Sequence, residues 1–188
     1  MENINAHQHE LLVNYSKAKN RLHLIDYDGT LAPIQPHPRL ATPSTELKEL
    51  LSTLAKDSAN RIVVISGREK QNLEQWLGDL PITLAAEHGG FYKEPDQSWQ
   101  TFFPDPTEWK EKTYAVLEAL VSQFKGSFIE EKHYSIAWHY RALANKISEQ
   151  DKEEIFAVIR SLSTNDEFLL YDEDCTVELR TPGVDKGK

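Results

Sequence analysis

Two acidic side chains stand two residues apart in the segment Asp26-Tyr27-Asp28-Gly29-Thr30. Carboxylates placed in this way can divide the work of phosphoryl transfer: one attacks phosphorus, and the other protonates the leaving oxygen and then activates water. A Mg²⁺ ion held by carboxylate and backbone oxygens would offset the repulsion between an anionic nucleophile and an anionic substrate. The plain alternative is a turn closed by an Asx hydrogen bond. An apolar strand followed directly by DxDGT is rare by chance, which favours the interpretation as phosphoryl-transfer chemistry.

The elements around this motif predict a parallel α/β sheet. Residues 21–25 form an apolar run typical of a buried strand, and in open α/β sheets ligands bind beyond the carboxyl ends of the strands. Residues 61–66 and 82–90 predict two more strands. The helix between the first two strands is expected to start at Thr42-Pro43, and the next helix spans residues 69–77. Strands that alternate with helices in this way pair in parallel.

The second half of the chain has a different order of predicted helices and strands. It predicts a helix at residues 109–124, two strands, a helix at 148–162 and two further strands. This order is typical of an α+β unit whose antiparallel sheet is covered on one side. We therefore expect a leader helix or linker at residues 1–20, a core at 21–104 and 181–188, and an inserted α+β domain at 105–180.

Two further motifs have the residue types that bind phosphate. Ser66-Gly67-Arg68 closes the second predicted strand and opens a helix, where a hydroxyl and unpaired N–H groups can hold an anion. Serine is also a common helix N-cap, so this motif alone is weak. Lys186, in GVDKG, could neutralise phosphoryl oxygens, although an isolated lysine is usually a solvated charge.

Together these motifs resemble the haloacid-dehalogenase-like phosphatases, and more specifically the trehalose-6-phosphate phosphatases. The chain is similar to the phosphatase half of bifunctional trehalose-synthesis proteins. The matching segments are LIDYDGTLAPI, VVISGR, LAAEHG, FIEEK, WHYR and VELR followed by GVDKG, which together run from about residue 21 to the end. The resemblance implies a Rossmann-like core with an inserted α+β cap domain, dependence on Mg²⁺, and hydrolysis of trehalose 6-phosphate through an aspartyl-phosphate.

The resemblance also implies a role for individual residues. Asp26 would be the nucleophile and Asp28 the general acid and base, and both would ligate the metal. The implied phosphate-binding residues are Ser66, Gly67 and Lys186; the implied substrate-binding residues are Arg68, His88, Gly89, Glu130, Lys132 and Glu178. Two rival functions stay open: a phosphatase of another sugar phosphate, and a non-catalytic sugar-phosphate sensor fused to a synthase.

Strand periodicity supports the sugar-binding residues separately. Side chains two residues apart share one face of a strand. This places Glu130 with Lys132, His139 with Arg141, and Glu178 with Arg180, while apolar residues such as Trp138 and Leu179 lie on the opposite faces. Without the resemblance, an ordinary solvated sheet face would be the simpler interpretation.

Composition limits the partners. The 188 residues include 30 acidic and 21 basic side chains, a net charge of −9 that argues against nucleic acid or an anionic membrane as partner. Cys175 is the one cysteine, which favours a cytoplasmic setting, and we expect it to be a buried apolar residue. His7 with His9, and His133 with His139, lack the spacing of a metal site.

The end of the sequence carries one more expectation. The acidic fourth motif of the resembled family lies beyond Lys188, and Asp172 and Asp174 are expected in a turn where they cannot replace it. Without the strand of that motif, residues 21–25 would have an unpaired edge, and the metal site would lack ligands. We therefore expect these 188 residues alone to be inactive and marginally folded.

Overall fold

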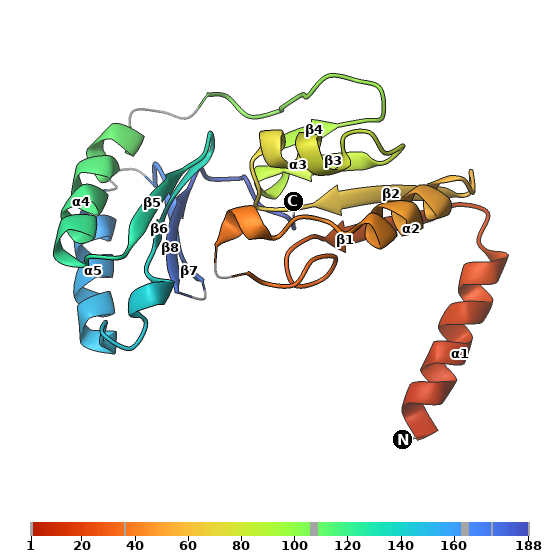
Figure 1. Ribbon diagram of the computed structural model, residues 1–188, viewed down its shortest axis with the longest axis horizontal. Helices are drawn as coiled ribbons and strands as arrows, with labels where there is room; N and C mark the ends of the chain where they lie inside the picture. Colours follow the sequence, from red (N-terminus) through yellow and green to blue (C-terminus); the bar gives the residue numbers. More distant parts are fainter. Residues whose placement is uncertain (1, 36, 106–108, 163–165, 174, 188) are drawn as a thin grey trace.

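The computed structural model describes all residues except 1, 36, 106–108, 163–165, 174 and 188. Two four-stranded sheets organise the chain, and each has its own helices and its own cluster of buried apolar side chains (Figure 1). We call the part built on strands β1–β4 the first unit and the part built on strands β5–β8 the second unit. A helix, α1 (Glu2–Lys17), precedes both and extends away from them.

The first unit contains the predicted parallel sheet. Its strands lie in the order β1 (Arg21–Asp26), β2 (Asn60–Ile65), β3 (Thr83–Ala86) and β4 (Phe91–Lys93). The first three are parallel, and β4 runs antiparallel to β3. Asp26 pairs with Ile65, which pairs with Ala85, so the carboxyl ends of three strands meet at one edge. This edge is where the fold places its ligand-binding loops.

Helices α2 (Thr45–Ala55) and α3 (Lys70–Leu77) join these strands. The expected start of α2 at Thr42 is wrong. Ser44 is the N-cap, and its hydroxyl accepts the Leu47 N–H at 3.2 Å. The cap lies two residues later because Ser44, rather than Thr42, reaches an amide of the first turn.

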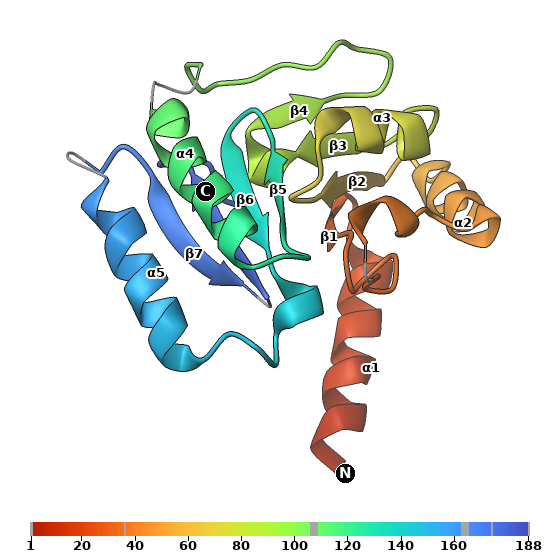
Figure 2. The ribbon, with the colours of Figure 1, turned by 60° about the vertical axis from the view of Figure 1, so that its left-hand side comes forward.

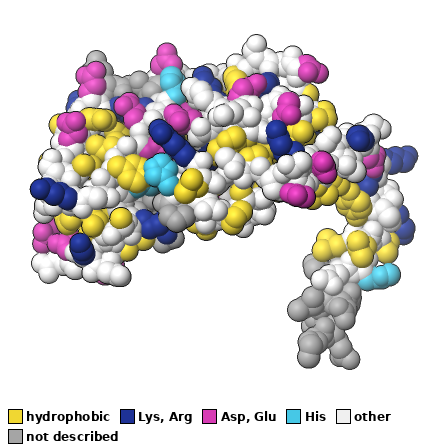
Figure 3. Space-filling view, viewed as in Figure 1, with side chains coloured by type: hydrophobic (Ala, Val, Ile, Leu, Met, Phe, Trp, Pro, Cys, Tyr) yellow, Lys and Arg dark blue, Asp and Glu magenta, His cyan; other side chains and the backbone are white. Residues whose placement is uncertain are grey.

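One edge of the first sheet is open. Among the described residues, no strand pairs with the outer side of β1. This agrees with the expectation that residues 21–25 have an unpaired edge. The expectation of a buried strand is therefore only half right, since Leu22 and Leu24 are 61% and 67% exposed. Figure 3 shows hydrophobic side chains at the surface where α1 meets the first unit. Tyr15 of α1 lies against Arg21 of this strand, with the guanidinium carbon 4.5 Å from the ring centroid.

The second unit is the predicted antiparallel α+β layer. Its strands lie in the order β5 (Phe128–Glu131), β6 (Ser135–His139), β8 (Thr176–Arg180) and β7 (Leu169–Glu173). Helices α4 (Trp109–Gln123) and α5 (Glu149–Ser161) cover the face that points away from the first unit (Figures 1 and 2). Trp138 and Leu179 pack beneath them. The other face of the sheet looks toward the first unit.

Three local expectations in this unit need correction. Arg141 is not on a strand with His139, because β6 ends there and Arg141 opens a short 3-10 turn, Arg141–Leu143. Asp172 lies within β7 rather than in a turn, and Asp174 lies outside the described residues. Cys175 precedes β8 instead of beginning it and is only partly buried, with a φ of 55°.

One tyrosine of the second unit is buried in the first unit. Tyr134, in the turn between β5 and β6, is completely buried among apolar side chains of the first unit. Its N–H donates to Glu87 Oε2 at 2.8 Å, and its hydroxyl lies 2.9 Å from Thr101 Oγ1. A Cβ at Gly90 would lie 2.4 Å from the tyrosine ring, so only glycine leaves room for it. We call this contact the Tyr134 anchor.

Candidate active site

A cavity of about 310 Å³ lies between the two sheets, at the carboxyl ends of β1 and β2. Most of the candidate residues from the sequence line it; Ser66 and Gly89 do not. The lining residues are Asp26, Asp28, Gly67, Arg68, His88, Glu130, Lys132, Ala137, His139, Thr176, Glu178 and Lys186. Residues far apart in the sequence therefore form one site.

The two acids reach the cavity from the end of β1. Asp26 is the last residue of the strand, and Asp28 lies in the turn that follows. Tyr27, between them, is fully buried, and its hydroxyl donates to the Ala41 carbonyl at 2.7 Å. Burial, with a contribution from the charge of Asp28, raises the pKa of Tyr27 to about 12, so the phenol stays neutral. The buried tyrosine fixes the turn from which both carboxylates project.

Each acid has its own cation. Lys186 Nζ lies 2.5 Å from Asp26 Oδ1. Arg68 donates from Nε to Asp28 Oδ2 at 2.9 Å and from Nη2 to Asp28 Oδ1 at 2.5 Å. The side chains of Asp26 and Asp28 are 42% and 35% exposed. The Lys186–Asp26 pair is partly exposed on both sides, so it can exchange partners with an incoming anion, whereas the Arg68 side chain is only 11% exposed.

The turn between β2 and α3 lies behind Asp28. Ser66 is buried, accepts the Arg68 N–H on its hydroxyl at 3.1 Å and lies 3.5 Å from Asp28 Oδ2. A Cβ at Gly67 would lie 2.5 Å from His88 Nε2. Glycine at this position therefore lets the histidine approach the turn.

The loop that carries His88 has an unusual backbone. Glu87 and His88 have φ values of 47° and 58°, and Gly89 follows with a φ of 96°. A non-glycine residue in such a region costs on the order of 1–3 kcal/mol and persists only where its surroundings hold it. Here the His88 N–H donates to the Ser66 carbonyl at 2.8 Å and the Glu87 N–H to the Arg68 carbonyl at 2.9 Å. The strained loop aims His88 into the cavity and Glu87 at the Tyr134 anchor.

The opposite end of the cavity is a buried charge network on the second sheet. Glu178 accepts from Ser135 Oγ at 2.7 Å, lies 3.5 Å from Lys132 Nζ and 3.4 Å from His88 Nε2, and also pairs with Arg180. Burial alone would raise the pKa of Glu178. The hydrogen bond from His88 and the nearby positive charges outweigh it, so the pKa lies far below the usual carboxyl value.

Lys132 and Glu130 continue this network. Their charged groups lie 3.7 Å apart. Burial works against the charged lysine, but Glu178 and Glu130 more than compensate and raise the pKa of Lys132. Burial also opposes the charged form of Glu130, whereas the His139 hydrogen bond and Lys132 hold its pKa below the usual value. All three groups are therefore charged at neutral pH.

Sequence reasoning missed two residues that line the cavity, Ala137 and Thr176, and gave no role to a third, His139, which it had placed on the charged face of its strand. The available signal was the strand period, because Ala137 pairs with both Glu130 and Glu178 and His139 follows two residues later on the same face. Both ring nitrogens of His139 have partners. Nε2 lies 2.8 Å from Glu130 Oε2, and Nδ1 lies 3.1 Å from Thr176 Oγ1.

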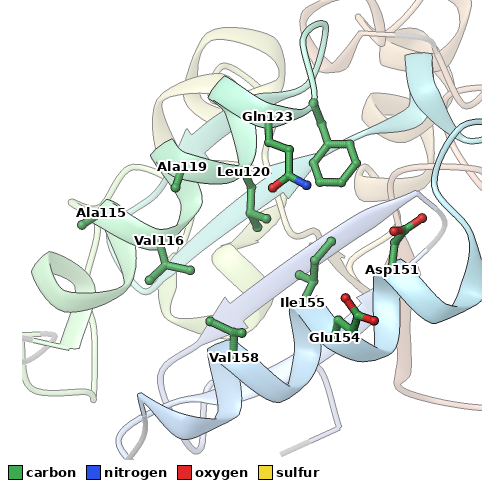
Figure 4. A pocket seen from close by; sticks show the side chains of 10 residues that line it. Ala115, Val116, Ala119, Leu120, Gln123, Asp151, Glu154, Ile155 and Val158 are labelled. Atoms are coloured by element: carbon green, nitrogen blue, oxygen red, sulfur yellow. The ribbon is translucent and has the colours of Figure 1, made fainter.

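A larger apolar groove of about 490 Å³ lies elsewhere, between helices α4 and α5. Figure 4 shows Leu120 and Ile155 projecting from the two facing helices, with Val158 near by. The groove is on the side of the second sheet that points away from the acids (Figure 2). It contains no cluster of catalytic groups, so the polar cavity is the candidate active site.

Asp26 and Asp28 offer oxygen donors of the kind that Mg²⁺ prefers. Within the described part of the chain, no group of three or more His, Cys, Asp or Glu side chains is arranged to hold a metal ion. The two aspartates therefore fit a magnesium site but supply only part of its ligand set.

A parallel sheet with paired acids at a strand end, facing a second α+β layer, defines the class of haloacid-dehalogenase-like phosphatases. The family model for trehalose-phosphatase matches residues 24–188, and the chain belongs to this family. Metal dependence is general in phosphatases of this class.

Three relatives illustrate the similarity. A bifunctional trehalose-6-phosphate synthase/phosphatase of Thermoproteus tenax is 38% identical over 95% of the chain and 24% of its own length. A trehalose-phosphatase of Saccharomyces cerevisiae is 37% identical over 95% of the chain and 20% of its own length. The structure of the Candida albicans trehalose-6-phosphate phosphatase C-terminal domain matches with a TM-score of 0.81 and 34% identity, over 94% of the chain and 62% of that domain. The chain thus spans about a fifth to a quarter of these two curated relatives.

Proposed function

We propose that the full-length protein hydrolyses trehalose 6-phosphate to trehalose and phosphate. Residues 21–104 and 181–188 would be the phosphatase core, and residues 105–180 its cap. The observation that carries the proposal is the composition of one cavity. The Asp26 and Asp28 carboxylates are at one end, and the buried Glu130–Lys132–Glu178 network is at the other. A sugar phosphate needs both kinds of surface.

Asp26 is the nucleophile in this proposal. Its carboxylate attacks phosphorus, and the bond from phosphorus to the sugar oxygen breaks, which gives an aspartyl-phosphate. Asp28 gives a proton to the leaving sugar oxygen and then removes one from the water that hydrolyses the intermediate. Because Arg68 occupies both oxygens of Asp28, this proton transfer requires the guanidinium to move away.

Phosphate binding is assigned to the cations and to the turn after β2. Lys186 lies at Asp26 and can neutralise the phosphoryl oxygens, and the Ser66 hydroxyl with the Gly67 peptide can hold them. Arg68, once released from Asp28, has a guanidinium suited to the same group. A Mg²⁺ ion, held by the Asp26 carboxylate and the Asp28 carbonyl oxygen, would supply further neutralisation of the phosphoryl charge.

Sugar binding is assigned to the second sheet. Glu130, Lys132 and Glu178 present acceptors and donors in a fixed array, which suits the hydroxyl groups of a disaccharide. His88 reaches the carboxylate of Glu178 from the first unit, and Gly89 supports the loop that carries His88. The binding energy of the sugar therefore positions the phosphate at Asp26.

Partners follow from the same proposal. The name of the Thermoproteus tenax relative combines synthase and phosphatase, so we include a fused or associated trehalose-6-phosphate synthase as partner. We also propose a cytoplasmic location. Within the described residues, no helix is both long and apolar enough to span a bilayer.

A substrate panel tests the proposal. Phosphate release from the full-length protein is measured with trehalose 6-phosphate, sucrose 6-phosphate, glucose 6-phosphate and p-nitrophenyl phosphate, with and without Mg²⁺. We expect the highest kcat/KM for trehalose 6-phosphate and no turnover without the metal. A preference for sucrose 6-phosphate would replace the sugar assignment, and absence of any turnover would favour the non-catalytic sensor.

A further inference from the structure

Three aromatic rings lie stacked across the junction of the two units, at the exposed edge of the cavity. Phe128 of β5 stacks on His139 of β6, with ring centroids 4.7 Å apart and an interplanar angle of 19°. His37, in the loop that follows the acidic turn of the first unit, stacks on Phe128 at 5.6 Å and 7°. We call these three rings the aromatic stack.

We infer that His37 is a positioning residue for the substrate: through Phe128 it holds His139, and His139 holds the carboxylate of Glu130 in the cavity. This inference takes its substrate from the proposed function, but the contacts between the three rings are observed independently of that function. His139 is at the inner end of the stack and lines the cavity. Phe128 and His37 are not among the residues that line it.

The inner ring is fixed by both of its nitrogens. His139 bonds Glu130 through Nε2 at 2.8 Å and Thr176 through Nδ1 at 3.1 Å. These bonds set the plane of the imidazole, and Phe128 then covers its face. A change in the position of Phe128 would therefore act on Glu130 through one rigid ring.

The outer ring is fixed within the first unit. His37 Nδ1 accepts the Arg39 N–H at 3.3 Å, next to a short 3-10 turn, Pro38–Leu40. This bond orients the imidazole locally, before any contact with the second unit. Phe128 is 37% exposed, and His37 is exposed as well, so apolar burial gives little support to either ring. The stacking itself is what joins this loop to the second unit.

The other end of the cavity shows why this contact matters. The Tyr134 anchor fixes the β5–β6 turn to the first unit by burial and hydrogen bonds. Glu130 and Lys132 lie along the chain between Phe128 and Tyr134. The segment pairs with β6 throughout, and its contacts with the first unit are a firm anchor at one end and exposed aromatic stacking at the other. Movement at the Phe128 end would displace the sugar-binding carboxylate and leave the phosphate site unchanged.

The test uses substitutions that remove or restore a ring. His37→Ala and Phe128→Ala remove stacking, and His37→Phe keeps it without an imidazole. Two matched controls change similar side chains elsewhere: His9→Ala on helix α1, and Phe102→Ala, an aromatic residue that is 81% exposed and stacked on Tyr92. Amide hydrogen exchange of residues 128–131 and the KM and kcat values for trehalose 6-phosphate and p-nitrophenyl phosphate are compared.

We expect faster exchange in β5 for His37→Ala and Phe128→Ala. The KM for trehalose 6-phosphate should rise roughly two- to tenfold, which is the range for loss of one aromatic pair, with no change for the aryl phosphate. His37→Phe should return both readouts to within about twofold of the parent protein, by the same stacking argument. The double variant should be no worse than Phe128→Ala alone, because Phe128→Ala already removes both ring pairs of the stack.

Two results would overturn the inference. Unchanged exchange in His37→Ala would show that the rings do not hold the segment. Faster exchange with equal kinetic losses on both substrates would show that the stack supports the fold and does not position Glu130. A parent protein that hydrolyses neither substrate would remove the proposed function, whereas the exchange rates would still decide whether the stack holds β5.

Discussion

The two ends of the cavity are built in opposite ways. At the first unit, Asp26 and Asp28 are partly exposed, and each pairs with one cation. At the second unit, Glu178 and Lys132 are almost fully enclosed, and each has several partners. The acids of the first end lie at the last residue of a strand and in the turn that follows, whereas Glu130 and Glu178 of the second end lie within the strands of a sheet.

In the proposed function, this difference would separate chemistry from recognition. An ion pair between partly exposed side chains has a small net free energy, so Lys186 could leave Asp26 for a phosphoryl group at little cost. A buried network is expensive to rearrange, because a charge left without its partner in a low dielectric is strongly destabilising. We therefore expect substitutions at the first end to affect turnover and substitutions at the second end to affect substrate choice and folding.

The largest effect is expected at the aspartates. Asp26→Asn should abolish phosphate release from the full-length protein, because an amide is a very poor nucleophile. Asp28→Asn removes the general acid and base, which should lower kcat by about 10²–10⁴. Release of inorganic phosphate from trehalose 6-phosphate is the measurement. Asp79→Asn, at an exposed acid paired with Lys48 on the surface, is the control. Turnover by Asp26→Asn at the parent rate would remove its assignment as nucleophile.

Glu178 should separate two substrates. If Glu178 binds the sugar as proposed, Glu178→Ala removes a charge-assisted hydrogen bond worth about 1.5–3 kcal/mol, so kcat/KM for trehalose 6-phosphate should fall roughly ten- to a hundredfold. Hydrolysis of p-nitrophenyl phosphate should change much less. Because the alanine also removes one of the two carboxylates that pair with Lys132, Glu178→Gln is compared as a variant that keeps the shape of the side chain. Equal losses on both substrates would mean that this carboxylate supports the phosphate site or the fold.

The strand and helix pattern of both units was predictable because it depends on local periodicity. Asp26, Asp28 and Ser66 follow predicted strands directly, and the parallel pairing that brings their strand ends together follows from the same pattern. The Tyr134 anchor was not predictable. It depends on how a turn of the second sheet meets Gly90 and Glu87, some 45 residues earlier in the chain. No local sequence pattern indicates such a contact between distant segments.

His139 shows the same limit at the site itself. Its spacing from Ala137 put it on the charged face of its strand, but a histidine with few charged neighbours in the sequence has no evident role. The role that we infer for it depends on contacts with Glu130 of the neighbouring strand, Thr176 of another strand and Phe128 above its ring. Leu22 and Leu24 were misjudged for a related reason, since burial of an apolar run depends on which strand lies beside it.

The pH dependence of unfolding should reveal the buried end. The pKa of Glu178 in the folded protein lies well below the ordinary carboxyl value, despite burial, because His88 and the neighbouring cations favour its charged form. Stability from this group is therefore complete above the pKa of the unfolded chain and is lost as the pH falls from there toward the folded pKa. One such group contributes at most about 1.4 kcal/mol per pH unit below roughly pH 4.3.

Urea unfolding of the parent protein and of Glu178→Gln between pH 7 and pH 3.5 measures this contribution of Glu178 to stability. The free energy of unfolding of the parent should fall more steeply with decreasing pH than that of the glutamine variant. Parallel curves would show that Glu178 has no special role in acid sensitivity. Asp79→Asn again provides a matched surface control, because Asp79 forms an exposed pair.

The smallest effect on stability is expected at Lys186, and Lys132 at the other end of the cavity provides the comparison. Lys186 pairs with a single partly exposed carboxylate, so Lys186→Met should change the free energy of unfolding by about 0–1 kcal/mol while strongly reducing phosphate release. Lys132→Met leaves Glu178 and Glu130 without their shared cation, which should cost on the order of 3–5 kcal/mol. Urea unfolding at neutral pH measures both variants in one experiment.

Raising the salt concentration should weaken the Lys186 pair in the parent protein and leave the enclosed Lys132 network nearly unchanged, because ions screen only the exposed end. Equal losses of stability in the two variants would show that both ends of the cavity are held by the same kind of interaction, and the division between an exchangeable phosphate end and a fixed sugar end would then fail.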